Sequence, residues 1–298
     1  MRVFVAGATG AVGRFLVPLL LEAGHQVTGT ARTRAGLDRL RAQGATPVQV
    51  DVFDADGLAG AVAAASPDTM IHQLTALAKG TPADNGRIRR EGTRNLVDAA
   101  VRAGVTRIVA QSVAWAYAPG DAPAGEDVPL DRSAPPPRSN MIGGITALEE
   151  TAAELDEHVV LRYGTFYGPG TWYSPDGLVA DVLRGEGDAG GAAAFVGRLQ
   201  ADDGVTSFVH VEDAARAAVA ALDWPSGPVN IVDDDPAAAR DWLPVLAAAF
   251  GAPPPPPATG RAGWQRGARN ARARSFGWQP RHSSWRTGFT TMEGAGRT

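Results

Sequence analysis

The chain has 298 residues, a formal net charge of −4, a sequence pI near 5.8 and no cysteine. This length is enough for one large α/β domain with a smaller appendage. The acidic balance argues against nucleic acid as the main partner, because binding to phosphate backbones needs a basic face. The lack of cysteine excludes disulfides and thiolate catalysis, and no apolar run approaches the roughly 20 residues that span a membrane. We therefore expect a soluble, cytoplasmic protein with no membrane partner.

The first half of the chain alternates short runs rich in β-branched residues with segments of helical length. Such alternation requires parallel strands joined through helices, which predicts a Rossmann-type, doubly wound α/β sheet. The expected strands are residues 2–6, 25–31, 47–52, 69–74, 106–112 and 158–164.

The second half of the chain is less regular. We expect residues 1–164 to form the Rossmann domain, and strands near 206–211 and 228–232 to return to its sheet, so that about 205–232 completes this domain. The rest is expected to form a small C-terminal lobe that binds the substrate. This lobe would comprise residues 165–204 and 233–298.

A glycine-rich turn, GATGAVG, separates the first expected strand from the first helix. Gly7, Gly10 and Gly13 let the backbone turn tightly and approach a pyrophosphate, whose charge then meets the helix N-terminus. An ordinary strand-to-helix turn can carry the same letters, but the strand before and the helix after it favour a nucleotide site. Further contacts are expected from Thr9, Ala11 and Val12.

The end of the second strand indicates which nucleotide is bound. An acidic residue there would bind a ribose 2′-hydroxyl, whereas this chain has Arg32 and Arg34, which can pair with a 2′-phosphate. Two exposed loop arginines are the alternative, but the lack of a nearby acid favours NADP(H). Asp51, followed by Val52, ends the third strand and is expected beside the adenine, unless it caps the next helix.

Six further segments continue the pattern: VDVFD (50–54), EGTRNLVDAAVRAGV (91–105), IVAQSVAWAY (108–117), LRYGTFYGPG (161–170), FVHVEDAARA (208–217) and NARARSFGWQP (270–280). With the glycine turn, this ordered set resembles the extended and atypical short-chain dehydrogenases/reductases. The resemblance implies NADP(H) over the glycines and a nicotinamide near Ser112. It also implies cofactor contacts from Leu74, Thr75, Tyr163, Gly164, Thr165 and Phe166.

The catalytic pair of that family is missing from the sequence. In the family, a Tyr-x-x-x-Lys motif at the start of a helix passes a proton to the substrate oxygen as hydride arrives, and the lysine lowers the pKa of the tyrosine. Here GGITALEE aligns with that helix start, which places Gly143 at the tyrosine position and Ala147 at the lysine position. The one lysine of the chain is Lys79, and Thr75 stands four residues before it.

Ser112 is the remaining candidate for a catalytic side chain. The family serine lies four residues before a tyrosine, but Val113 holds that position before Tyr117. The hydroxyl of Ser112 should therefore point differently from a strand, unless a bend at the strand end restores it. We expect His72 and His210 to be structural. No cluster of His, Asp and Glu has metal-ligand spacing, so no metal is expected.

The segments expected around the nicotinamide are rich in aromatic residues, which can bury a flat ring system or pack as core. Hydride addition to an isolated ketone needs an acid, whereas a polycyclic hydroxyquinone delocalises its product anion and can use the proton of its own phenol. We predict NADPH-dependent reduction of a carbonyl on a polycyclic aromatic polyketide, with the proton from substrate or water. The combination resembles atypical ketoreductases of antibiotic biosynthesis, such as the simocyclinone type acting on angucyclinones. The expected substrate contacts are Trp115, Tyr117, Tyr167, Trp172 and Tyr173.

Two other functions remain open. A non-catalytic sensor or regulatory protein would bind NADP(H) and turn nothing over. A nucleotide-sugar epimerase or dehydratase would need the tyrosine that this chain lacks, which makes it the weaker alternative. The oligomeric state remains open.

Overall fold

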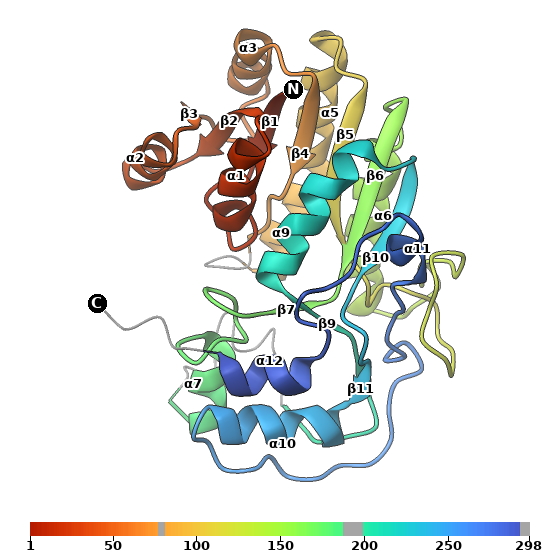
Figure 1. Cartoon of the computed structure of the whole chain (residues 1–298). Coiled ribbons are helices and arrows are strands. Elements are labelled where there is room, and N and C mark those ends of the chain that lie inside the picture. The colour runs from red at the N-terminus through yellow and green to blue at the C-terminus, as the bar shows by residue number, and fades with distance from the viewer. Residues whose placement is uncertain (77–80, 187–198, 293–298) are drawn as a thin grey trace.

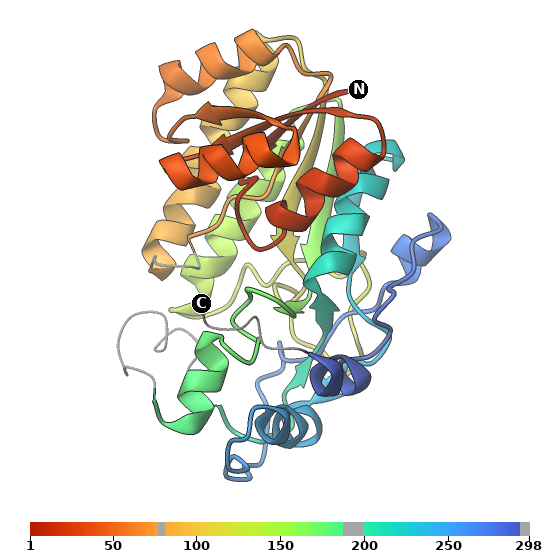
Figure 2. The same cartoon turned by 60° about the vertical axis from the view of Figure 1, so that its left-hand side comes forward.

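The computed structural model describes residues 1–76, 81–186 and 199–292. Lys79 lies outside the described residues. A sheet with helices on both faces forms the larger part of the described chain, and a smaller group of helices lies beyond one end of its strands (Figures 1 and 2). Within these ranges, no helix combines the length and hydropathy that a bilayer crossing requires.

The main sheet of the described chain has seven parallel strands in the order β10-β6-β5-β4-β1-β2-β3. The strand order reverses between β1 and β4, and ligands of doubly wound folds bind beyond the carboxyl ends of strands at such a point. The predicted Rossmann-type sheet is confirmed. The strands are β1 Arg2–Ala6, β2 Gln26–Ala31, β3 Thr46–Gln49, β4 Thr69–His72, β5 Arg107–Val113, β6 Glu157–Tyr163 and β10 Gly227–Ile231.

The apolar strand sequences follow from burial on both faces of the sheet. In β1, Val3 and Val5 pack into the core on one face, while Phe4 and Ala6 pack into the core on the other, because successive side chains alternate across a strand. Helices cover both faces, so a central parallel strand is apolar throughout.

The helices divide between the two faces. Helix α1 packs with α9 on one face, and α5 packs with α3 and α6 on the other. Between α4 and α5, residues Ile88–Gly92 form a π-helical turn, η1. The bounds are α1 Gly13–Glu22, α2 Arg34–Gln43, α3 Ala55–Ala65, α4 Pro82–Arg87, α5 Thr93–Arg102, α6 Arg138–Ala152, α9 Val211–Ala220, η2 Ala221–Asp223 and α11 Ala271–Ser275.

The smaller group of elements lies beyond the carboxyl ends of the strands (Figure 2). Aromatic side chains form much of its core, among them Tyr167, Phe208, Trp242, Trp285 and Phe289. Its elements are β7 Thr165–Tyr167, α7 Leu178–Arg184, β8 Val205–Thr206, β9 Phe208–His210, β11 Ala237–Ala238, α10 Ala239–Ala249 and α12 Trp285–Thr291.

One expectation about the main sheet is wrong. Residues 228–232 return to it through β10, but residues 206–211 do not, because β8 pairs with β11 and β9 pairs with β7. At the end of β6, a Cβ atom on Gly164 would lie 2.7 Å from the carbonyl oxygen of Ser207. The two segments therefore approach closely just beyond the sheet, where β7 and β9 pair with each other.

Candidate active site

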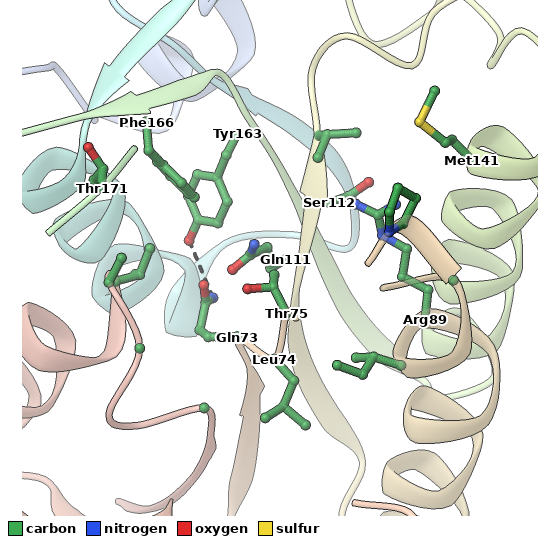
Figure 3. Close-up of a pocket in the computed structure, with 18 of the residues that line it drawn as sticks. Gln73, Leu74, Thr75, Arg89, Gln111, Ser112, Met141, Tyr163, Phe166 and Thr171 are labelled. Carbon is green, nitrogen blue, oxygen red and sulfur yellow. Dashed lines mark hydrogen bonds between the residues drawn. The ribbon is translucent and has the colours of Figure 1, made fainter. Parts of the chain in front are cut away.

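A cavity of about 1310 Å³ lies at the carboxyl ends of the strands, between the glycine turn and the smaller group of elements. Its wall combines residues from the ends of β1, β2, β4, β5 and β6 with residues from α6 and from the loop after β7. Figure 3 shows Tyr163 and Phe166 on one side and Ser112, Arg89 and Met141 on the other. Most functional side chains named below belong to this wall.

Backbone geometry requires glycine in the turn after β1. Gly7 has a φ of +92°, and a Cβ atom on it would lie 2.6 Å from the carbonyl oxygen of Gln73. A Cβ atom on Gly13 would lie 2.3 Å from the carbonyl oxygen of Gly7, so Gly13 packs beneath the turn rather than lining the cavity. The N-terminus of α1 thus opens onto a bare backbone surface, which fits the pyrophosphate of a nicotinamide dinucleotide. The turn lines the cavity with Gly7, Thr9, Gly10, Ala11 and Val12.

The two arginines after β2 have different positions. Arg32 is exposed and lines the cavity. Arg34 does not line it and instead forms an ion pair with Asp38, with 3.2 Å between Nε and Oδ2. Arg32 is therefore the better placed of the two for a 2′-phosphate. Asp51 and Val52 line the same end of the cavity, where the adenine was expected.

The predicted nicotinamide region is assembled at the ends of β4 and β6. Burial raises the pKa of Tyr163, and its phenol donates to the carbonyl oxygen of Ala214 and accepts from Nε2 of Gln73, both at 3.3 Å. Tyr163 is therefore a weak acid whose proton is already engaged. The predicted residues of this region that line the cavity are Leu74, Thr75, Tyr163, Gly164, Thr165 and Phe166.

Ser112 lines the cavity, but its hydroxyl is engaged in the protein. It donates to Oε1 of Glu149 at 2.6 Å, and Arg162 holds the same carboxylate through two bonds of 3.0 and 2.6 Å. A serine hydroxyl has one proton to donate. Ser112 can therefore accept a hydrogen bond from a ligand, but in this arrangement it has no proton left to give.

The structure does not bring the two positions predicted on α6 to the cavity. Gly143 is exposed, and neither Gly143 nor Ala147 lines the cavity. Met141 lines it, and Ile145, one turn further along, is buried. Of these four residues, Met141 alone contributes to the cavity wall, and Ile145 packs in the core. None of these four residues is a tyrosine or a lysine.

Three of the five aromatic residues predicted to contact substrate line the cavity: Trp115, Trp172 and Tyr173. The other two are core residues, which corrects the prediction. Tyr117 is 1% exposed, packs in a small core cluster with Ala124 and Val232, and donates to Oδ1 of Asn230 at 2.6 Å. Tyr167 is fully buried against Phe208 and Phe289 in the core of the smaller group.

His72 and His210, which were expected to be structural, make contacts within the protein. His72 is buried and hydrogen bonded to Thr93 at 3.0 Å, and burial lowers the pKa of His72 to about 4. His210 caps α9 by accepting from the backbone N–H of Glu212. Neither histidine lines the cavity.

Sequence reasoning missed several side chains of the cavity wall. Gln73 and Gln111 lie at the ends of β4 and β5, beside residues that were predicted, so their position at strand ends could have identified them. Trp264 comes from an irregular segment with no motif. Arg89 lies on the π-helical turn, where α-helical periodicity gives the wrong direction for a side chain.

Comparisons with known proteins place the chain among its relatives. Residues 3–232 match the NAD dependent epimerase/dehydratase family. A Streptomyces protein named 3-diazoavenalumate denitrifying reductase is 44% identical over 97% of this chain and 99% of its own. A Thermus thermophilus UDP-glucose 4-epimerase in complex with NAD superposes with a TM-score of 0.73 and 25% identity, covering 99% of this chain and all of that one. The UDP-Glc/GlcNAc 4-epimerase of Campylobacter jejuni has a TM-score of 0.76 at 17% identity, covering 97% and 96% of the two chains, and shares the fold.

Proposed function

Because this oxidoreductase belongs to the NAD dependent epimerase/dehydratase family, we propose that it transfers hydride from NADPH to a planar aromatic acceptor without an acid from the protein. The observation that carries the proposal is the wall opposite the glycine turn. Met141 faces the cavity from α6, and the proton of Ser112 is donated to Glu149. Burial raises the pKa of Tyr173 to about 12, so this phenol is also a poor acid near neutral pH.

The first acceptor class that we propose is an aryl diazo compound. The name of the Streptomyces relative states a diazo substrate and a denitrifying reduction. When hydride reaches an arenediazonium ion, a C–H bond replaces the C–N bond, N2 leaves with the electron pair of the broken bond, and no proton is taken up. A ketone differs, because hydride addition creates an alkoxide that needs a donor. Such a denitrifying reduction suits a cavity that offers no acid.

In this proposal, the residues of the chain hold and shield the reactants. The glycine turn and Arg32 hold the dinucleotide, whose nicotinamide supplies the hydride when bound. Trp115, Trp172 and Tyr173 bury the flat face of the acceptor and exclude water. We propose the smaller group of elements as the substrate lobe, since its residues Trp172 and Tyr173 line the cavity; strands β8 and β9 belong to it in addition to the predicted 165–204 and 233–298, of which 187–198 and 293–298 lie outside the described residues. Rate enhancement then comes mainly from holding donor and acceptor face to face.

A second acceptor class is a carbonyl of a polycyclic hydroxyquinone, as in aromatic polyketide antibiotics. The cavity of about 1310 Å³ is larger than the roughly 300–1,000 Å³ of typical small-molecule sites, which is compatible with a bulky acceptor beside the cofactor. A phenol beside the carbonyl would supply the proton.

The nucleotide-sugar epimerase alternative has related folds in its favour, but α6 faces the cavity with Met141 instead of a tyrosine. An NADP(H) sensor would have the same cofactor-binding residues but would catalyse no reaction.

The test is loss of NADPH absorbance, together with release of N2, in a panel of acceptors. The panel contains a 4-hydroxycinnamate with a 3-diazo group, an angucyclinone, a simple aliphatic ketone and UDP-glucose, each with an enzyme-free control for direct reduction. We expect enzyme-dependent turnover of the diazo compound with one N2 for each NADPH. Turnover of the angucyclinone alone would establish the second class. NADPH binding without any turnover would establish a sensor, and conversion of UDP-glucose would contradict both proposed classes.

A further inference from the structure

Arg89 is a charged side chain of the cavity wall that the proposed hydride transfer does not use. It projects from the π-helical turn η1 and lines the cavity. In Figure 3 it lies on the side of Ser112 and Met141, across the opening from Tyr163 and Phe166. Single π-helical turns occur frequently at functional sites, because they redirect a side chain away from the helical pattern.

The neighbouring arginines are neutralised or tied to the backbone, and Arg89 is not. Arg87 forms a two-bond ion pair with Glu91, with distances of 2.6 and 2.8 Å. Arg90 donates to the carbonyl oxygens of Gly86 and Asn140. Among the residues that the structure describes, none forms a hydrogen bond or ion pair with the guanidinium of Arg89. Its positive charge therefore faces the cavity without a partner from the described chain.

The carboxylate of Glu149, which accepts a hydrogen bond from Ser112 of the same wall, is not free to neutralise Arg89. Glu149 already receives Arg162 through two bonds and the hydroxyl of Ser112 through a third. Burial and the charge of Arg90 lower the pKa of Arg89 to about 10, which still leaves it protonated at neutral pH. A partly buried charge without a partner is unfavourable, and an anion entering the cavity would remove that cost.

Helix α6 approaches this arginine at its glycine pair. A Cβ atom on Gly144 would lie 3.6 Å from Cδ of Arg89 and 3.6 Å from Cα of Gly86, and one on Gly143 would lie 3.3 Å from Nη2 of Arg90. A methyl group at Gly144 would thus make ordinary contacts with Arg89 and with α4, and one at Gly143 would meet the end of the exposed Arg90 side chain. Helix α6 therefore packs against α4 and η1 here, and Arg89 remains at the cavity surface.

We propose that Arg89 binds a carboxylate of the aromatic substrate, so that the enzyme selects aromatic acids; this inference rests on the proposed function of the cavity. The planar guanidinium matches a carboxylate with two parallel hydrogen bonds. A phosphate of the cofactor has related chemistry, but the pyrophosphate is expected at the N-terminus of α1 and a 2′-phosphate at Arg32, both on the other side of β4. Arg89 therefore lies at the part of the cavity where the hydride acceptor, rather than a cofactor phosphate, would bind.

The experiment is a calorimetric binding measurement on the full chain saturated with NADP+, with 4-hydroxycinnamate and its methyl ester as probes. A charge-assisted pair predicts that the acid binds about tenfold or more tightly than the ester. Arg89→Gln should remove this preference by weakening the acid alone, and Arg89→Lys should retain part of it. Arg102→Gln, which removes an exposed charge at the end of α5, should keep the full preference. Unchanged NADP+ affinity of the variants shows that they are folded.

Equal binding of acid and ester to the native protein, or no binding of the acid, would overturn the assignment. Weaker NADP+ binding in Arg89→Gln, with the acid preference intact, would assign Arg89 to a cofactor phosphate instead. The measurement involves no turnover. A preference for the acid together with no reduction of any diazo compound would therefore support the role of Arg89 and reject the proposed reaction. Reduction of a diazo compound without any preference for the acid would support the reaction and reject the role of Arg89.

Discussion

Two walls of the cavity, one formed by the glycine turn after β1 and the other by helix α6, differ in how strongly the backbone restricts their residues. On the glycine wall, the backbone itself requires particular residues, since Cβ atoms on Gly7 and Gly13 would lie 2.6 and 2.3 Å from carbonyl oxygens. On the α6 wall, the backbone sets no such requirement at the position that faces the cavity, which Met141 occupies. Cofactor binding is thus tied to the fold, whereas the chemistry of the acceptor side can change while the fold stays the same.

The largest effect is expected on the glycine wall. Gly7→Ala should weaken NADPH binding about a hundredfold or more, because the positive φ of Gly7 costs an alanine on the order of 1–3 kcal/mol and its Cβ atom would also clash with Gln73. Fluorescence titration of NADPH measures this loss. Gly24→Ala is the matched control, because Gly24 has a φ of +80° with nothing within 4 Å. It should cost about 1 kcal/mol of unfolding free energy and leave NADPH affinity unchanged.

A smaller effect is expected at the end of β2. Arg32→Ala should lower the preference for NADPH over NADH about tenfold, since a charge-assisted bond to phosphate contributes roughly 1.5–3 kcal/mol. The ratio of kcat/KM for the two cofactors measures it. Arg34→Ala removes the same charge from a side chain that is paired with Asp38 outside the cavity. Should both variants keep the native preference, the 2′-phosphate is bound elsewhere.

On the α6 wall, restoring a phenol should change little. Met141→Tyr places a tyrosine on the inward-facing position, where a positioned general acid typically contributes about 10²–10⁴-fold. If the acceptor needs no protein acid, the single-turnover rate with a diazo substrate should change less than about threefold. Ser112→Ala should be equally mild, because the hydroxyl proton already goes to Glu149. A strong rise in rate for Met141→Tyr would mean that the native reaction is limited by a missing acid.

The smallest effect is expected from pH. Burial raises the pKa values of Tyr163 and Tyr173, the latter to about 12. Both phenols therefore stay protonated and uncharged between about pH 6 and pH 9 and neither gains nor loses a charge there. The single-turnover rate should be flat across this range, as stopped-flow records of NADPH oxidation would show. A rate that falls steeply with rising pH would indicate a titrating acid in the protein.

The contrast between the walls also explains how far the sequence could predict the structure. The glycine turn was predictable because the backbone at Gly7 and Gly13 leaves no room for a Cβ atom, so the sequence must have glycine there. The phase of α6 was not, because helical periodicity gives the repeat of a face but not which residue meets the cavity, and Met141 rather than Gly143 does so. Tyr117 and Tyr167 are adjacent to cavity segments in sequence, but their rings turn into the core.

Arg89 and the strand β9 were unpredictable for a related reason. The π-helical turn η1 contains one extra residue, which rotates the side chain of Arg89 away from the direction that an α-helix would give it. No proline within the turn and no side-chain cap marks its position in the sequence. Strand β9 has the letters of a buried strand, FVH, but whether it joins the main sheet or pairs with β7 depends on the close approach at Gly164. Both features are set by tertiary packing rather than local propensity.

The most direct test of hydride transfer without a protein acid is a pair of single-turnover isotope measurements with the diazo-substituted 4-hydroxycinnamate. One compares NADPH with NADPH deuterated at the transferred position, and the other compares H2O with D2O. We predict a slower reaction with the deuterated cofactor and equal rates in the two solvents. A clearly slower reaction in D2O would show that a proton moves in the rate-limiting step, which would contradict the absence of an acid.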